Sequence, residues 1–523
     1  MIRTAVVDTD PFELSSDALL VLVDPDRDAP TAPVARIDAP LGGQASLLRQ
    51  EDRRDALFLR HRRATGDGEP LPVALARVDR AAARRSPLGV AQPGEAPGDD
   101  ERAHALELEA WRVAGATAAR AASRAGLRRL TLLVDADATD PSAIAAAAEG
   151  ALLGAHRTRR EGIDAPEAGG LEQLTVVVPA PADADATTAV QQAVERAAVL
   201  AEATGWARDA VDAPANRMTP QQLAQTAAEA GRAAGLRVRV NDERWMRERG
   251  MGALLAVAQG SAQPTRVVVV EHRPDRRDLP SVAWVGKGVT FDSGGLSLKD
   301  RASMPAMKGD MAGAAAVLGA ALAVARLDLP VRMVAIAVLV ENMPDGAAYR
   351  PSDVVVAADG TAIEIVSTDA EGRLALADGL LYAQEFGCDV AGDVATLTGG
   401  AVVALGAGTS AAAFGNDPAW SSQLASAGAR AGEAVWPMPI YDAYLRAIES
   451  RVADLKNGGV REGSAGIGAA FLQRFAPTRW AHLDIAGIAW TDQPIGVWNE
   501  GATGYGVRTL VEATGSLASE PRA

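Results

Sequence analysis

Short apolar runs alternate with longer alanine- and arginine-rich stretches over the first 180 residues of the chain. The runs have the length and the Val/Leu content of strands, whereas the longer stretches are typical of helices. Alternating strands and helices predict an α/β domain. The predicted strands are TAVVD (4–8), ALLVLVD (18–24), LTLLVDAD (130–137) and LTVVV (174–178), and the predicted helices cover residues 102–126 and 142–160.

Further along the chain the apolar runs become nearly continuous. Continuous runs are typical of strands in a sheet that helices cover on both faces, so we expect a second, larger α/β domain. Its predicted strands are VVVVEH (267–272), VAWVGKGVTF (282–291), VRMVAIAVLV (331–340) and VAGDVATL (390–397), with helices at Ala312–Arg326 and Leu374–Phe386.

The segment Pro179–Thr187, PAPADADAT, has the composition of a linker and precedes an apolar-periodic helix. It places the domain boundary between the two α/β patterns. We therefore predict an N-terminal α/β domain over residues 1–186, a connecting helix over 187–206 and a second domain over 207–523.

Composition narrows the functional classes. The chain has 523 residues, with 52 Lys+Arg against 67 Asp+Glu and a net charge of −15, which gives no basic footprint for nucleic acid or an anionic membrane. A single cysteine, Cys388, excludes an intramolecular disulfide framework and a cysteine-based metal cluster. The N-terminus does not resemble a signal peptide, and the longest apolar run, 311–325, is too short to span a bilayer and favours a buried helix. These features favour a cytoplasmic location.

Lysine is rare, and its positions point to two polar clusters. Only Lys287, Lys299, Lys308 and Lys456 occur, and three of them lie close together in the sequence. The first cluster, within Val285–Asp310, follows a predicted strand that ends in a Gly-Gly turn, where α/β sheets place their sites. The second is STDAEGRL (367–374), between a predicted strand and a helix. The acidic residues of the two clusters are Asp292, Asp310, Asp369 and Glu371.

Four converging carboxylates would need cations, and hard oxygen ligands suit divalent metals, including a pair bridged by a shared carboxylate. The alternative is that these residues are helix caps, turn residues and solvated charges; Asp369 in particular could cap the following helix. The five histidines contain no His-x-x-x-His pair, which excludes the zincin pattern. Spacing alone leaves both interpretations open.

Five motifs, in this order and spacing, resemble the leucine aminopeptidase family of dinuclear-metal cytosolic aminopeptidases. The resemblance extends over residues 200–512, and residues 1–180 match more weakly. It implies a smaller N-terminal macro-domain-like sheet and a larger catalytic domain with a central mixed sheet flanked by helices. The motifs are GKGVTFDSGGLSLK, MKGDMAGAAAV, ENMPDGAAYRPSD, STDAEGRLALAD and DVATLTGG.

The resemblance implies two divalent metal ions in each subunit, Mn²⁺ or Zn²⁺, with Mg²⁺ and Co²⁺ as further candidates. By motif, Lys287 and Asp310 would bind the tighter ion and Asp369 the more exchangeable one, while Asp292 and Glu371 would bridge them. Lys287 could act as a ligand only as a neutral amine, which an adjacent dication makes feasible.

The same resemblance implies a reaction: release of leucine and other apolar N-terminal residues from peptides by two-metal activated water. Lys299 would remain charged and stabilise the oxyanion. Arg373 would hold a bicarbonate ion that acts as general base. Four residues would line the substrate pocket, with core packing and a turn as the alternative for the first and last: Met307, Thr396, Leu397 and Gly399.

The resemblance also implies a homohexamer, a dimer of trimers.

Four residues depart from the family pattern, none of them at a proposed metal ligand: Ser367 and Asp212 replace Asn, Ser352 replaces Gly, and Gly400 replaces Ala. A second hypothesis, which the resemblance suggests because some family members also bind DNA, is a DNA-binding or regulatory protein that acts through the N-terminal domain. The stretch Arg49–Arg63 is locally basic. The net charge of −15 argues against this hypothesis, and a solvated face is the better interpretation of that stretch.

Overall fold

The computed structural model describes residues 184–519 without a break. Before them it describes residues 3–7, 16–26, 57–61, 71–90, 100–136, 140–158 and 171–177, with Pro11, Leu14, Val34, Ala35 and Gln44. The linker 179–187 lies largely outside the described residues. So does the basic stretch Arg49–Arg63, except for the backbone of one strand.

The chain divides into two units. Unit 1 comprises Met1–Ala91, Glu95–Gly205 and Asp492–Glu500, and unit 2 comprises Gln92–Gly94, Trp206–Thr491 and Gly501–Ala523. The boundary near residue 205 falls inside one long helix, α6 (Ala184–Asp212), which replaces the predicted helix over residues 187–206.

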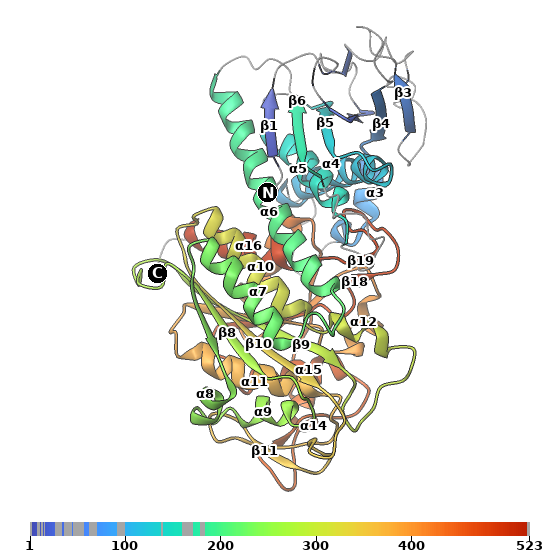
Figure 1. Ribbon diagram of the computed structural model, residues 1–523. Coiled ribbons are helices and arrows are strands. Elements are labelled where there is room, and N and C mark those ends of the chain that lie inside the picture. The colour runs from blue at the N-terminus through green and yellow to red at the C-terminus, as the bar shows by residue number, and fades with distance from the viewer. Residues whose placement is uncertain are drawn as a thin grey trace. The chain divides into compact units, whose positions relative to one another are not determined.

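Unit 1 is built around a six-stranded sheet in the order β1-β6-β5-β2-β4-β3 (Figure 1). All its neighbouring strands are parallel except β3, which is antiparallel to β4. Helix α4 packs on β2 and β4, and α5 packs on α4, β5 and β6. The four strands predicted from apolar runs are confirmed. The bounds are β1 Arg3–Val7, β2 Ala18–Val23, β3 Leu57–His61, β4 Leu71–Arg77, α3 Arg80–Arg85, α4 Asp100–Arg124, β5 Arg129–Val134, α5 Pro141–Ala155 and β6 Gln173–Val177.

Unit 2 contains an eight-stranded mixed sheet in the order β15-β14-β17-β13-β9-β10-β8-β7. The four central strands, β17, β13, β9 and β10, are parallel to their neighbours in that group. The strands are β7 Arg237–Asn241, β8 Arg266–His272, β9 Ser281–Asp292, β10 Arg332–Asn342, β13 Val390–Ala395, β14 Ala411–Gly415, β15 Val435–Pro437 and β17 Trp480–Asp484.

Helices cover both faces of this sheet, as its continuous apolar strands predict. Helices α7, α10 and α16 lie on one face, and α9, α11 and α15 lie on the other (Figure 1). The helices are α7 Pro220–Ala233, α8 Glu243–Glu248, α9 Gly252–Ala258, α10 Ala312–Arg326, α11 Glu371–Gln384, α12 Gly399–Leu405, α13 Pro418–Ala431, α14 Asp442–Ala447, α15 Ser464–Gln473 and α16 Val507–Ser516.

Two smaller sheets complete unit 2: β11 (Val354–Val356), β12 (Ala362–Glu364) and β16 (Leu455–Lys456), and the pair β18 (Trp490–Thr491) and β19 (Gly501–Ala502). Among the described residues, one helical stretch, Met304–Arg326, is long and apolar enough to cross a membrane. Its apolar window is 78% buried inside the protein, and α10, which forms most of it, packs against β9 and β10 as a core helix.

Candidate metal and substrate site

The carboxyl ends of the parallel central strands open into one pocket of about 510 Å³. Parallel strands bring their following loops to the same sheet edge, which explains why segments far apart in sequence meet here. All eleven residues proposed from the sequence line this pocket: Lys287, Asp292, Lys299, Met307, Asp310, Asp369, Glu371, Arg373, Thr396, Leu397 and Gly399.

Lys287 lies on β9 and is surrounded by oxygen atoms. Its Nζ is 2.8 Å from Asp310 Oδ1, 2.9 Å from Glu371 Oε1 and 2.8 Å from the main-chain oxygen of Thr396. Burial disfavours the ammonium, but the charges of Asp310, Glu371 and Asp292 outweigh burial and raise the pKa of Lys287. A metal ion bound by this amine must therefore displace a proton.

Lys299 forms ion pairs with the other two carboxylates, those of Asp292 and Asp369. Its Nζ is 2.8 Å from Asp292 Oδ2 and 2.6 Å from Asp369 Oδ1. Burial raises the pKa of Asp292 to about 6, the charge of Glu371 adds to this effect, and Lys299 and Lys287 oppose it. The site thus pairs four carboxylates with two lysine ammonium groups.

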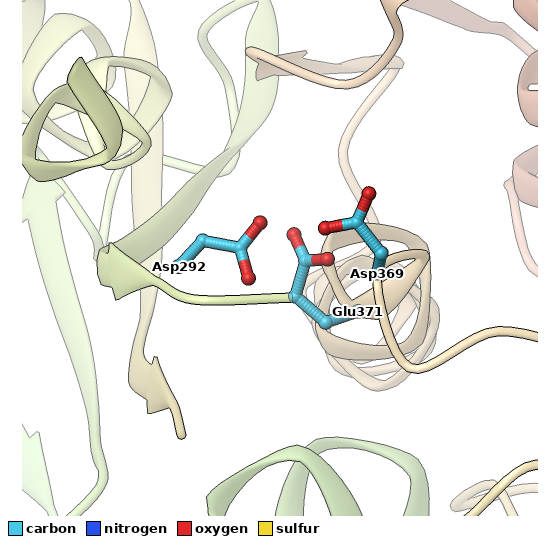
Figure 2. A group of neighbouring side chains, drawn as sticks. All are labelled: Asp292, Asp369 and Glu371. Carbon is cyan, nitrogen blue, oxygen red and sulfur yellow. The ribbon is translucent and has the colours of Figure 1, made fainter. Parts of the chain in front are cut away.

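Asp292, Asp369 and Glu371 turn their carboxylates toward one another, with Asp292 at the end of β9 and the other two beside the start of α11 (Figure 2). One oxygen from each lies within 4.8 Å of the others, an arrangement that could hold a cation. The helix-cap alternative for Asp369 is wrong, because the N-cap residue of α11 is Ala370 and not Asp369.

The carboxylate oxygens also fit divalent metals. Glu371 Oε2 is buried and accepts no hydrogen bond, and Asp310 Oδ2 is buried with Lys287 Nζ 2.8 Å away. A buried polar atom without a partner is rare and costly, and this one belongs to a carboxylate that faces the pocket. The residues present therefore fit a metal centre, and the lysine ammonium groups occupy the space between carboxylates.

Supporting groups fix these carboxylates in place. Asn342, at the end of β10, donates to Asp292 Oδ1 at 2.8 Å and to the main-chain oxygen of Thr368 at 2.9 Å. Thr396 Oγ1 donates to Asp310 Oδ1 at 2.7 Å. Gly372 lets α11 approach Lys287, because a Cβ there would lie 2.5 Å from the Cε of that lysine.

Asp484, at the end of β17, organises the loop that carries Thr396, Leu397 and Gly399. Its carboxylate accepts hydrogen bonds from Leu397 N at 3.1 Å and from Thr398 Oγ1 at 2.6 Å. Sequence reasoning assigned no role to Asn342, Gly372 or Asp484, although Asn342 and Gly372 lie within the quoted motifs. The residues that they contact are distant in the sequence, so the spacing of residues within a motif does not indicate these contacts.

The structure shows the backbone conformation or the contacts of each of the four residues that depart from the family pattern. Ser352 has φ of 76°, a conformation that favours glycine. A Cβ on Gly400 would lie 2.3 Å from Ser464 Oγ, so the missing methyl group makes room for that hydroxyl. Ser367 Oγ accepts from Asp369 N at 3.2 Å, and Asp212 Oδ1 accepts from Ala502 N at 2.9 Å.

Comparisons with known proteins agree with this geometry. A family model described as "Cytosol aminopeptidase family, catalytic domain" matches residues 205–511, more than half of the chain. A protein of Syntrophotalea carbinolica named probable cytosol aminopeptidase is 46% identical over 343 residues, which are 65% of this chain and 68% of that protein.

Two solved structures are similar over nearly the whole chain. The bottromycin maturation enzyme BotP in complex with Mn has a TM-score of 0.78 and 35% identity, covering 96% of this chain and all of that one. A mutant of tomato leucine aminopeptidase has a TM-score of 0.79 and 30% identity, covering 99% of this chain and 97% of that one.

Proposed function

Because this chain belongs to the cytosol aminopeptidase family and is a metal-dependent leucyl aminopeptidase, we propose that it removes leucine and other apolar N-terminal residues from peptides. The observation that carries this preference is the composition of the pocket. Beside the carboxylates and lysines, its wall consists largely of apolar side chains, and burial of an apolar substrate side chain is favourable there. The apolar wall is formed by Val211, Ala306, Met307, Leu397, Val402, Ala486, Ala489 and Trp490.

We propose that the five ligands act in two sets: Lys287 and Asp310 at the tighter site, and Asp369 at the exchangeable one. Asp292 and Glu371 would bridge the two. Two divalent ions held there, Mn²⁺ or Zn²⁺ with Mg²⁺ or Co²⁺ as alternatives, would supply Lewis acidity and an activated water molecule. The similar structure of BotP in complex with Mn supports a divalent cofactor.

Lys299 would keep its proton and stabilise negative charge on the scissile carbonyl oxygen. The carboxylates of Asp292 and Asp369 raise the pKa of Lys299 despite burial, so the ammonium persists at neutral pH. A preorganised charge of this kind is a strong source of rate enhancement.

Arg373 would hold a bicarbonate ion as general base. Arg373 is 8% exposed and lines the pocket, and its Nε has no hydrogen-bond partner. A buried, unsatisfied cation favours a small anion.

The proposal also covers the cellular location, the oligomeric state and the domain organisation. The chain would act in the cytoplasm as a homohexamer, with residues 1–186 as an N-terminal domain, 187–206 as a connection and 207–523 as the catalytic domain. The DNA-binding alternative gains no support: the relatives are named as aminopeptidases, and the stretch on which it depends lies mostly outside the described residues.

Hydrolysis of leucine p-nitroanilide by metal-stripped protein, refilled separately with Zn²⁺, Mn²⁺, Co²⁺ or Mg²⁺, tests the function. We expect no activity in the stripped protein and recovery with at least one ion. N-acetyl-leucine p-nitroanilide is the matched control, because it lacks the free amine and should not be cleaved. Failure of every ion, or equal cleavage of the acetylated substrate, would contradict the proposal.

A further inference from the structure

Lys308 lies in the motif MKGDMAGAAAV beside Asp310, yet its side chain does not contact the carboxylates of the site. It belongs to the short 3₁₀ helix η2 (Met304–Gly309), one residue after Met307 and two before Asp310. Its Nζ donates to the main-chain oxygen of Asp212, the last residue of α6. The same Nζ lies 5.1 Å from the centroid of the Trp490 ring.

The residues that Lys308 contacts, Asp212 and Trp490, are also linked to each other through β18 and β19. Asp212 Oδ1 accepts from Ala502 N at 2.9 Å, and Ala502 pairs with Trp490 in the small sheet of β18 and β19. Asp212 therefore holds one strand of the pair through its carboxylate, and its main-chain oxygen holds the lysine that contacts the other strand. Gly501 keeps this approach open, because a Cβ there would lie 2.9 Å from Asp212 Oδ1.

Each contact is favourable for an ammonium group at this position. The last turn of a helix has carbonyl groups without intrahelical partners and a negative dipole end, both of which attract a cation. An ammonium over the face of an indole ring is attracted by the ring quadrupole, and more strongly when partly buried. Lys308 is half-buried, so both contacts are partly shielded from solvent.

The linked contacts of Lys308, Asp212 and Trp490 lie along one side of the substrate pocket. Trp490, Val211 and Met307 line the pocket, and they lie on β18, near the end of α6 and on η2, the three elements that Lys308 connects. We infer that Lys308 and Asp212 are positioning residues that hold Trp490 as a wall of the pocket for the substrate's N-terminal side chain. The inference rests on the proposed function, which it deepens by naming residues that set its specificity.

The test compares leucine and alanine p-nitroanilides with metal-loaded Lys308→Met, which keeps the length of the side chain and removes its charge. We expect KM for the leucine substrate to rise about 10-fold, as loss of a partly buried cation–π contact and a charged hydrogen bond would produce, with kcat and bound metal nearly unchanged. The alanine substrate, whose side chain reaches less of the wall, should be affected much less.

Three further variants and one control variant make the result specific. Lys308→Arg should restore most of the leucine preference, and Trp490→Leu should lose it as Lys308→Met does. The double variant Lys308→Met/Trp490→Leu should be no worse than either single variant, because coupled residues give non-additive effects. Lys456→Met is the matched control: this lysine lies on β16 and lines no part of the pocket, so its kinetics should equal wild type.

Several outcomes would overturn the inference: equal losses on the two substrates, additive effects in the double variant, or wild-type kinetics in Lys308→Met. If Lys308→Met does not fold, Trp490→Leu decides, since unchanged leucine preference in that variant would also exclude the proposed wall. Wild-type protein that cleaves neither substrate after metal refilling would instead contradict the proposed function.

Discussion

Lys287 and Lys299 both contact two carboxylates, but their exposure differs in a way that matches different roles. The side chain of Lys287 is 3% exposed and also contacts the main-chain oxygen of Thr396, whereas that of Lys299 is 16% exposed. A lysine in a closed cage of oxygen atoms can exchange its proton for a metal ion, while the more open ammonium of Lys299 is accessible to a substrate oxygen.

We predict that Lys299→Ala lowers kcat by about 100-fold, as loss of one oxyanion donor does in other hydrolases. Metal content, measured by mass spectrometry on the dialysed protein, should stay at the wild-type value, which separates loss of chemistry from loss of ligands. Lys456→Ala serves as control, because it removes a lysine that does not line the pocket. An unchanged kcat with full metal occupancy would exclude the electrophilic role.

At the scale of elements, the start of α11 matters because it places two proposed site residues, Glu371 and Arg373, on its first turn. Because Gly372 has no side chain, that turn leaves room for the side chain of Lys287 on β9. An added Cβ would lie 2.5 Å from Lys287 Cε and 2.7 Å from its Nζ, so the amine of Lys287 would have to move.

Gly372→Ala should therefore displace the amine of Lys287 and weaken metal binding, with a loss in kcat/KM of about 10- to 100-fold, as expected for groups that orient ligands. Titration of the stripped protein with Mn²⁺, followed by activity, measures the change in affinity. Gly346→Ala is the control, since a Cβ there meets no atom within 4 Å. Equal metal affinity in both variants would show that this close approach is unimportant.

Much of this architecture could be predicted from the sequence, since continuous apolar runs correctly located β8, β9, β10 and β13. The strands β14, β15 and β17 were missed because AAAFG and VWP are short and weakly patterned, and WAHLD carries a buried His482 and Asp484. Their strand character comes from pairing within the sheet, which local propensity does not report. For the same reason the contacts of Lys308 were not predicted: Asp212 and Trp490 are far from it in sequence.

For the whole molecule, unit 2 exposes several large apolar side chains, which the proposed hexamer would bury where they lie at its interfaces. Contiguous apolar patches are typical of contact regions between proteins, whereas single exposed apolar side chains are ordinary. The most exposed examples in unit 2 are Val403, Val452, Leu298 and Val460, with fractional exposures of 85%, 67%, 62% and 62%.

Sedimentation velocity should therefore show a single species with the mass of six chains of 54.0 kDa. The species should persist on tenfold dilution, because obligate interfaces are extensive and largely apolar. Monomers at every concentration would contradict the hexamer without affecting the assignment of the site.

The segment Asp492–Glu500, which groups with unit 1, has a consequence for dividing the chain. Its Asn499 donates to the main-chain oxygens of Gly154 and His156 and accepts from Arg120. The same segment is the loop between β18 and β19, the strand pair that carries Trp490. A truncated protein beginning near residue 206 would keep this loop but lose every one of these partners. Transplanting the catalytic region into another protein would therefore require a redesigned loop, even though the matched family region begins at residue 205.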